Sequence, residues 1–452
     1  MGKYTRFSAR AGMAAMGGYF RGLWAEVEQR VHIRQKTIHY PPEQKLLLAA
    51  LDILAGGQGI VEINTRLRDD AGFLQAFGCQ GCADQSVVSE TLNACDEANV
   101  AEMRQSLRAL LERHGQCLQP HAHQRTPLLL DIDLTGLVAG RQGEGVTKGY
   151  FSGKKGARGR QLARVLATDY DEVVCEHLYP GKVQLPHVVE ELLDETEAIL
   201  QLTPERRQRT ILRVDAGAGS DAQIDLLLGR EYRLLTKVTS SSRSAKLARS
   251  VKTWYQDPKD PSREWGWPET PHAYVRATRQ VVARRQREGQ WHYRVLVTNL
   301  SDAMLCRLAR QPVRDDVTER ERLFLIAYAY DLRGGGVETS FKNSKCGLGI
   351  MKRNKKRFAA QAMLVQLAAL AYNFLTWVRR HLAQSDGKWA EYGPLRLVRD
   401  VGQIPGLIRL PRQGQEQLKI VLNKGHPLAT RFVHALVKSP LSGDLVLILG
   451  QT

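Results

Sequence analysis

The sequence predicts an α/β protein in which a mixed sheet with crossover helices is preceded by an all-helical region and interrupted by a β-rich insertion. Three observations lead to this prediction. Helical periodicity fills about the first 120 residues, and strand patterns replace it from Thr126. A hairpin pattern over 274–299 then separates the last strand of the sheet from a long helical stretch.

The N-terminal region, residues 1–122, contains helical patterns over 44–54, 85–94 and 96–115, and Asp84 can cap the second of them. Two short helices before a longer one fit a helix-turn-helix-like domain that binds DNA ends. A helical dimerisation or packing domain explains the same pattern equally well.

Strands and helices alternate over residues 123–238 in the order strand, strand, strand, helix, strand, helix, strand. The ribonuclease-H-like fold has this order and ends in a further helix. Residues 239–300 form the β-rich insertion before that helix, residues 301–384 are its helical continuation, and the role of residues 385–452 is not indicated. The strands are expected at 127–133, 161–168, 172–179, 210–214 and 232–238, and the helices at 185–202 and 220–228.

Charge favours a nucleic-acid partner. Lys and Arg number 65 and Asp and Glu 47, so the net charge is 65 − 47 = +18. Such a surplus destabilises a compact chain unless a polyanion compensates it. The most apolar stretch, Ala359–Val378, contains polar residues and predicts a buried helix rather than a membrane span. Few cysteines and no phosphate-binding glycine motif predict a cytoplasmic protein without a nucleotide cofactor.

Acidic residues lie at the ends of two strands expected to be neighbours. Asp131 and Asp133 close the first strand and share one face, because residues i and i+2 of a strand do so. Asp215 ends the fourth strand, and Glu338 begins a helix after three glycines. Neighbouring carboxylates repel each other unless a cation lies between them, and Mg²⁺ prefers such oxygen ligands. These residues therefore predict a metal-dependent site.

Three stretches in this order resemble the DDE transposases of bacterial insertion sequences. The first is LLLDIDLTGL with KGYFSGKKGARGRQL after it, and the second is ILRVDAGAGSD. The third, YDLRGGGVETSFKNSKCGLG, is similar to the Tyr-Arg-Glu-Lys signature of those enzymes. It supplies Tyr330, Arg333, Glu338 and Lys345, with four residues instead of three between Arg and Glu.

The resemblance implies that Asp133, Asp215 and Glu338 hold two Mg²⁺ ions, which Mn²⁺ can replace. Asp131 is the alternative for the first position. The resemblance further implies a nucleoid-associated homodimer that binds the terminal inverted repeats of its element. It would cut the strands and join the freed 3′-hydroxyls to target DNA. Tyr330, Arg333 and Lys345 would contact the backbone of the transferred end.

Basic runs beside the predicted site favour further DNA contacts. One run follows Glu338 and includes Lys342, Lys345, Lys352 and Arg353. A second run after the first strand holds Lys154, Lys155, Arg158 and Arg160.

Two further points stay open. In similar transposases an aromatic residue of the insertion stacks on a flipped base. Packing of the insertion's own core is the alternative for Trp254, Trp265, Trp267 and Trp291. The alternatives to a transposase are another ribonuclease-H-like nuclease and a catalytically inactive DNA-binding descendant.

Overall fold

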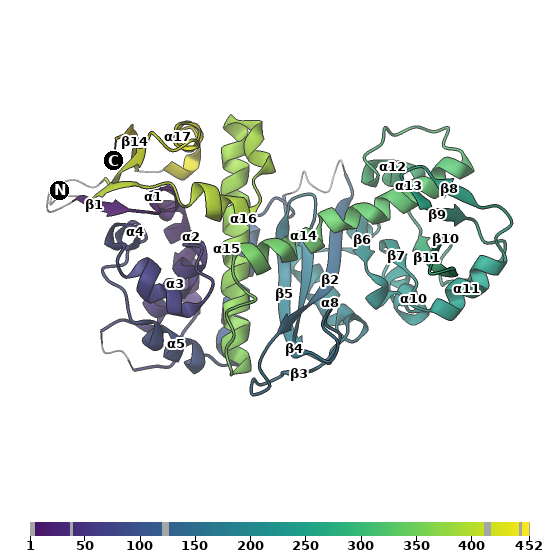
Figure 1. The fold of residues 1–452 in the computed structure, drawn as a ribbon, viewed down its shortest axis with the longest axis horizontal. Helices are drawn as coiled ribbons and strands as arrows, with labels where there is room; N and C mark the ends of the chain where they lie inside the picture. Colours follow the sequence, from purple (N-terminus) through teal and green to yellow (C-terminus); the bar gives the residue numbers. More distant parts are fainter. Residues whose placement is uncertain (1–4, 37–38, 120–125, 411–416, 443–444, 452) are drawn as a thin grey trace.

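The computed structural model describes residues 5–36, 39–119, 126–410, 417–442 and 445–451. A mixed sheet occupies the centre of the elongated molecule, the insertion lies at one end, and the N-terminal helices lie at the other together with the C-terminal segment (Figure 1).

The central strands follow the order β5-β4-β2-β6-β7. Strand β2 runs antiparallel to β4 and parallel to β6, so the first and fourth long strands of the region are neighbours, as the sequence predicts. This is the predicted ribonuclease-H-like order. The strands are β2 (Leu128–Val138), β3 (Thr147–Lys148), β4 (Arg158–Ala167), β5 (Glu172–Pro180), β6 (Thr210–Val214) and β7 (Arg233–Lys237).

Strand β2 is longer than predicted. The sequence places its end at Asp133, but the strand continues to Val138. The reason is its antiparallel partner: β4 pairs with β2 as far as Val138, whereas the parallel partner β6 ends at Val214, opposite Ile132. Asp133 therefore lies within β2 at the point where β6 ends.

Helices cover both faces of the sheet. On β5, Glu176 faces α15 (Phe358–Ser385), where Gln366 donates to its carbonyl oxygen over 2.7 Å. Cys175, on the opposite face, contacts α8 (Val189–Leu200) through Thr196. The face that carries Glu176 also packs against α14 (Val337–Lys342). The other helices of this region are α9 (Pro204–Arg207), α10 (Asp221–Gly229), α12 (Asp302–Leu308) and α13 (Glu319–Asp331).

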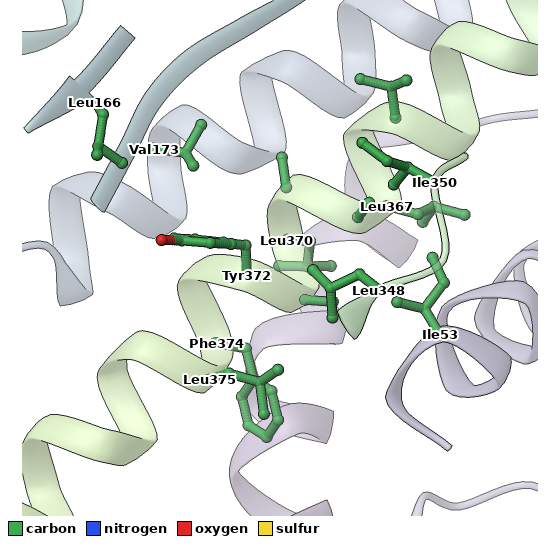
Figure 2. Packing of buried hydrophobic residues seen from close by; sticks show 14 of the residues in the cluster. Ile53, Leu166, Val173, Leu348, Ile350, Leu367, Leu370, Tyr372, Phe374 and Leu375 are labelled. Carbon is green, nitrogen blue, oxygen red and sulfur yellow. The ribbon is translucent and has the colours of Figure 1, made fainter. Parts of the chain in front are cut away.

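Helix α15 is the centre of the hydrophobic core. Figure 2 shows Leu370, Tyr372 and Phe374 of this helix packed among residues from distant segments, including Ile53 and Val173. The helix is long and apolar enough to cross a membrane, but 94% of its most apolar window is buried inside the protein. The prediction of a buried helix is confirmed.

The insertion extends the central sheet. Its strand β11 pairs antiparallel with β7, and β10, β9 and β8 continue beyond it. The edge of β7 is thus covered rather than exposed. The predicted hairpin is present, and a basic helix precedes it. These elements are α11 (Ser241–Arg249), β8 (Tyr255–Asp257), β9 (Asp260–Gly266), β10 (Arg279–Arg287) and β11 (Gln290–Thr298).

The sequence predicts an all-helical N-terminal region, but the structure also contains a strand there. Strand β1 (Thr5–Ser8) pairs with β12 (Gly406–Arg409) in a second sheet, with order β1-β12-β13-β14. The pairing joins segments some 400 residues apart, which local sequence patterns do not reveal. The other elements of the two terminal regions are α1 (Ala11–Ala14), α2 (Gly17–Arg30), α3 (Pro42–Leu54), α4 (Ala71–Ala76), α5 (Gln85–Ala94), α6 (Glu97–His114), α16 (Pro394–Arg396), β13 (Lys419–Asn423), α17 (Ala429–Val437) and β14 (Val446–Gly450).

A buried ion pair joins the N-terminal helices to the segment before α15. Arg353 is 2% exposed and its Nη2 donates to Asp52 of α3 over 2.7 Å. The same nitrogen donates to the carbonyl oxygen of Gly57. The predicted DNA contact of Arg353 is therefore wrong, because this side chain neutralises a buried carboxylate.

Replacing Arg353 with Ala leaves Asp52 buried without its partner. We expect the free energy of unfolding to fall by about 3–5 kcal/mol, the usual cost of an uncompensated buried charge. Urea unfolding followed by tryptophan fluorescence measures this change.

Two variants test the explanation. The double variant Asp52→Leu/Arg353→Met removes both charges and is expected to recover most of the lost stability. Lys352→Ala, at the exposed neighbouring position, is expected to change stability by less than about 0.5 kcal/mol. A loss in Lys352→Ala as large as that in Arg353→Ala would contradict the role of the buried pair.

Candidate active site

The parallel pairing of β2 with β6 brings Asp133 and Asp215 together. The register aligns Ile132 with Val214, so the two aspartates are the next residues on adjacent strands. Asp215 follows the last residue of β6, and its Oδ1 accepts a hydrogen bond from the N–H of Ala216 over 2.6 Å. The predicted juxtaposition of the two carboxylates is present.

Asp131 shares the face of Asp133, as predicted, but its carboxylate has a different environment. It is fully buried, and Arg213 of β6 donates to both of its oxygens over 2.7 and 2.8 Å. The side chain of Asp133 is 16% exposed and that of Asp215 is 42% exposed. Asp131 is thus committed to a structural ion pair, whereas Asp133 remains accessible beside Asp215.

The guanidinium of Arg333 bridges two of the three predicted carboxylates. Its Nη2 lies 2.9 Å from Oδ2 of Asp133, and its Nη1 donates to Oε1 of Glu338 over 2.9 Å. Arg333 is itself only 4% exposed, whereas the side chain of Glu338 is 55% exposed. The extra residue in the signature therefore does not separate Arg333 from Glu338.

Two further side chains hold Asp215. The hydroxyl of Tyr330 donates to Oδ1 over 3.2 Å, and Nζ of Lys237 lies 3.4 Å from the same oxygen. Lys237 ends β7, directly beside Asp215 in the parallel register. Lys237 is not among the site residues predicted from the sequence. A lysine that ends the strand next to an acidic strand end is the signal that could have found it.

These contacts set opposite protonation preferences for the two aspartates. Burial raises the pKa of Asp133 to about 6. The negative charge of Asp215 raises it further, and the positive charge of Arg333 opposes the rise. Burial also opposes ionisation of Asp215, but the charges of Lys237 and Arg333 hold its pKa below the ordinary value. Burial and the charge of Asp215 raise the pKa of Tyr330, which stays a hydrogen-bond donor at neutral pH.

The glycines before Glu338 allow the chain to pass close to β2. A Cβ atom on Gly336 would lie 2.1 Å from Oδ2 of Asp131 and 3.3 Å from Arg213, so only glycine fits. Helix α14 starts at the next residue, which places Glu338 beside Arg333. The buried ion pair of Asp131 thus also determines where the signature helix begins.

A second buried arginine anchors the signature helix to the sheet. Arg164 of β4 is fully buried and donates to the hydroxyls of Ser340 and Ser344 over 3.0 and 2.9 Å. Glu176 of β5 neutralises it, and the ring of Phe341 lies 4.9 Å from its guanidinium carbon. Arg164 is likewise not among the residues predicted from the sequence. Its signal is a charged residue inside the apolar run QLARVLAT, on the face of Asp133.

The other predicted DNA-contacting residues divide into two groups. Lys342 and Lys352 are exposed, and Lys345 is half-buried with Nζ donating to the hydroxyl of Thr135 on β2. In the second basic run, Arg160 is buried and donates to the carbonyl oxygens of Glu144 and Lys356, so its predicted contact with DNA is wrong. The remaining cations of that run are exposed or half-buried: Lys154, Lys155 and Arg158.

A basic groove leads from Lys237 and Tyr330, the two contacts of Asp215, onto the insertion. A cavity of about 200 Å³ begins at Lys237 and Tyr330 and follows the face of β10 and β11. Cations and aromatic rings line it, and the ring of Trp265 forms part of the wall. Its cationic lining residues are Lys237, Arg263, Arg284, Arg285, Arg287 and Arg294.

The insertion tryptophans have packing partners. The guanidinium of Arg284 lies between the rings of Trp254 and Trp291, 4.2 and 4.5 Å from their centres. The indole N–H of the buried Trp265 donates to Asp257 over 2.9 Å, and that of Trp267 donates to a carbonyl oxygen of α13. Trp291 is the most exposed of the four, at 42%.

The carboxylates suit a divalent ion by chemistry. Carboxylate oxygens are hard donors of the kind that Mg²⁺ and Mn²⁺ prefer. A single cation, the guanidinium of Arg333, already lies between Asp133 and Glu338. Among the residues that the structure describes, no three acidic, histidine or cysteine side chains are gathered closely enough to hold an ion. Arg333 and Lys237 balance the negative charge in this arrangement.

Comparison with known proteins identifies the family. The family model described as Transposase DDE domain group 1 matches residues 20–436. No curated protein matches the chain.

Two solved structures are similar to parts of the chain. One is the piggyBac transposase synaptic complex with hairpin DNA, with 14% identity and a TM-score of 0.43, covering 84% of this chain and 75% of that chain. The other is a pre-cleavage Mos1 transpososome, with 16% identity and a TM-score of 0.17, covering 45% of this chain and 62% of that chain.

The family model spans nearly the whole sequence, including every stretch on which the predicted site depends. The chain therefore belongs to the DDE transposases of group 1, enzymes that cleave and transfer DNA strands.

Proposed function

We propose that Asp133, Asp215 and Glu338 are the catalytic carboxylates of this transposase. The contacts of Arg333 are the observation that carries the proposal. One guanidinium bridges Asp133 and Glu338, and its charge also lowers the pKa of Asp215 on the neighbouring strand. Three carboxylates from separate segments thus face one cation, whereas Asp131 is occupied by Arg213.

The three carboxylates would hold two divalent ions, Mg²⁺ or Mn²⁺. When bound, such ions supply Lewis acidity at phosphorus and lower the pKa of a bound water. The preference for Mg²⁺ rests on the oxygen-only donor set.

The other side chains of the site position these groups and bind phosphate. Tyr330 and Lys237 hold the carboxylate of Asp215 in one orientation. Arg333 can exchange the carboxylates for two oxygens of a DNA phosphate, because its planar group binds both carboxylate and phosphate bidentately. Lys345, held by Thr135 next to Asp133, acts as a point charge on the same backbone.

The DNA path continues over exposed cations. Lys342 and Lys352 lie on the segment after Glu338, and the groove from Lys237 carries Arg287 and Arg294 at the insertion. We infer that the enzyme binds the terminal inverted repeats of its element and cuts the strands there. It then joins the 3′-hydroxyls to target DNA. Because two ends must be joined together, we propose a homodimer, acting on the nucleoid of a bacterial cytoplasm.

Asp215→Asn and Glu338→Gln test the catalytic assignment. Each keeps the shape of the side chain but removes a negative charge from the site, so we expect at least about a 100-fold loss of cleavage rate. The substrate is labelled duplex carrying the sequence that borders the gene, in Mg²⁺. Binding of the duplex is expected to stay within about threefold of the wild type, because neither carboxylate attracts a polyanion.

The controls separate the site from general charge effects. Asp315→Asn removes an exposed carboxylate elsewhere on the chain and is expected to leave cleavage unchanged. EDTA is expected to abolish cleavage by the wild type, and added Mg²⁺ to restore it. Tight binding without cleavage in either Mg²⁺ or Mn²⁺ would instead identify a catalytically inactive DNA-binding descendant.

The groove on the insertion predicts a salt-dependent effect. Replacing Arg287 and Arg294 together with Gln removes two phosphate contacts, so the slope of log K against log salt should become shallower by about 1.8. Fluorescence anisotropy at several salt concentrations measures the slope. The same charge change at the exposed residues Arg206 and Arg310, outside the groove, serves as the control. Equal slopes for both double variants would show that DNA does not use the groove.

A further inference from the structure

The side chain of Tyr150 is exposed in a way that packing does not explain. At 81% it is the most exposed large apolar side chain in the part of the chain that the structure describes. It belongs to the loop 149–157 between β3 and β4, four residues before Lys154, the first cation of the second basic run. Its ring therefore contributes little to the core and is available to a partner.

The backbone on both sides of Tyr150 is held firmly. Gln161, a buried residue of β4, donates to the carbonyl oxygen of Tyr150 over 3.0 Å. A Cβ atom on Gly149 would lie 1.8 Å from the carbonyl oxygen of Gly181, so only glycine fits at this position. Phe151 is 6% exposed, and its ring packs against Gly136 of β2. The loop thus presents a ring from a rigid base, which lowers the entropic cost of binding.

The loop and its flank carry positive charge. Lys154 and Lys155 of the loop and Lys148 at the end of β3 are exposed, and none of residues 145–170 except Asp169 is acidic. The N–H of Lys154 donates to the carbonyl oxygen of Phe151 over 3.0 Å, which closes a turn directly after the exposed ring. The neighbours of Tyr150 therefore complement a polyanion rather than an apolar protein partner.

The loop lies beside the proposed catalytic site. Gly136, on which Phe151 packs, is three residues beyond Asp133 on β2, about 10 Å along the strand and on its opposite face. Burial lowers the pKa of Lys345, and the charge of Lys154 adds to this effect, so the two lysines lie close to each other. DNA held at Asp133 and Lys345 would thus lie next to the loop.

We propose that loop 149–157 is a DNA contact in which the lysines hold phosphates and the ring of Tyr150 stacks on a base near the cleaved end. The inference rests on the proposed function, because it needs DNA at Asp133. Every base offers a face to an aromatic ring, so this contact requires no particular sequence. Tyr150 is a positioning residue in this proposal and takes no part in the chemical step.

The test uses duplex DNA carrying the sequence that borders the gene, with 2-aminopurine placed in turn at each position within about ten base pairs of the end. Wild-type protein is expected to change the fluorescence at one or two positions. Tyr150→Ala is expected to lose that change and to bind about 5-fold to 150-fold more weakly, whereas Tyr150→Phe keeps both. Phe7→Ala, at a 50% exposed aromatic residue on β1, is the matched control.

A second variant tests the charges separately. Lys154→Ala/Lys155→Ala is expected to make the salt slope shallower by about 1.8 while keeping the fluorescence change. If Tyr150→Ala binds within twofold of the wild type and keeps the fluorescence change, stacking by Tyr150 is wrong.

The proposed function has its own readout. If the wild type cleaves the duplex, and Tyr150→Ala keeps the wild-type binding and fluorescence change, only the proposed role of Tyr150 is wrong. If Asp215→Asn cleaves like the wild type while Tyr150→Ala loses the signal, the catalytic assignment fails and the DNA contact stands. A wild type that does not bind the duplex would overturn both.

Discussion

The parallel pairing of β2 with β6 is the constraint on which the site depends. Its register places Asp133 beside Asp215 and, two residues earlier, Asp131 opposite Arg213. A shift by one residue would turn Asp131 and Asp133 to the other face of the sheet, away from α14. The same ion pair limits the residue at Gly336, and so determines where α14, the helix that carries Glu338, begins.

Concentrated negative charge at one point of a sheet is unfavourable unless cations balance it. In this protein two buried cations lie beneath the site, and two further cations contact the accessible carboxylates. Arg213 and Arg164 are fully buried and serve the fold, since one pairs with Asp131 and the other anchors α14. Arg333 and Lys237 contact the accessible carboxylates instead. In the proposed function the second pair would exchange its partners for phosphate, because its carboxylates are partly exposed to solvent, whereas those of the first pair are buried.

The excess of Lys and Arg over Asp and Glu divides into two groups of cations. Some cations neutralise buried acids or backbone carbonyls, as Arg353 does for Asp52 and Arg160 for the chain before α15. Others lie on surfaces that continue away from the carboxylates, along the insertion and the loop after β3. The insertion can carry such a surface because β11 pairs with β7, which makes it a continuation of the central sheet rather than a separate lobe.

The sequence by itself determined the order of strands and helices of the central sheet and the neighbouring positions of Asp133 and Asp215. These features follow from local periodicity and from motifs within short stretches. Only the tertiary structure decided which charged residues are buried. Arg353 and Lys352 are adjacent in one basic run, yet one neutralises Asp52 and the other faces solvent. The pairing of β1 with β12 was likewise decided by contacts between distant segments. Burial and long-range pairing depend on what the rest of the chain places opposite a residue, and no local pattern carries that information.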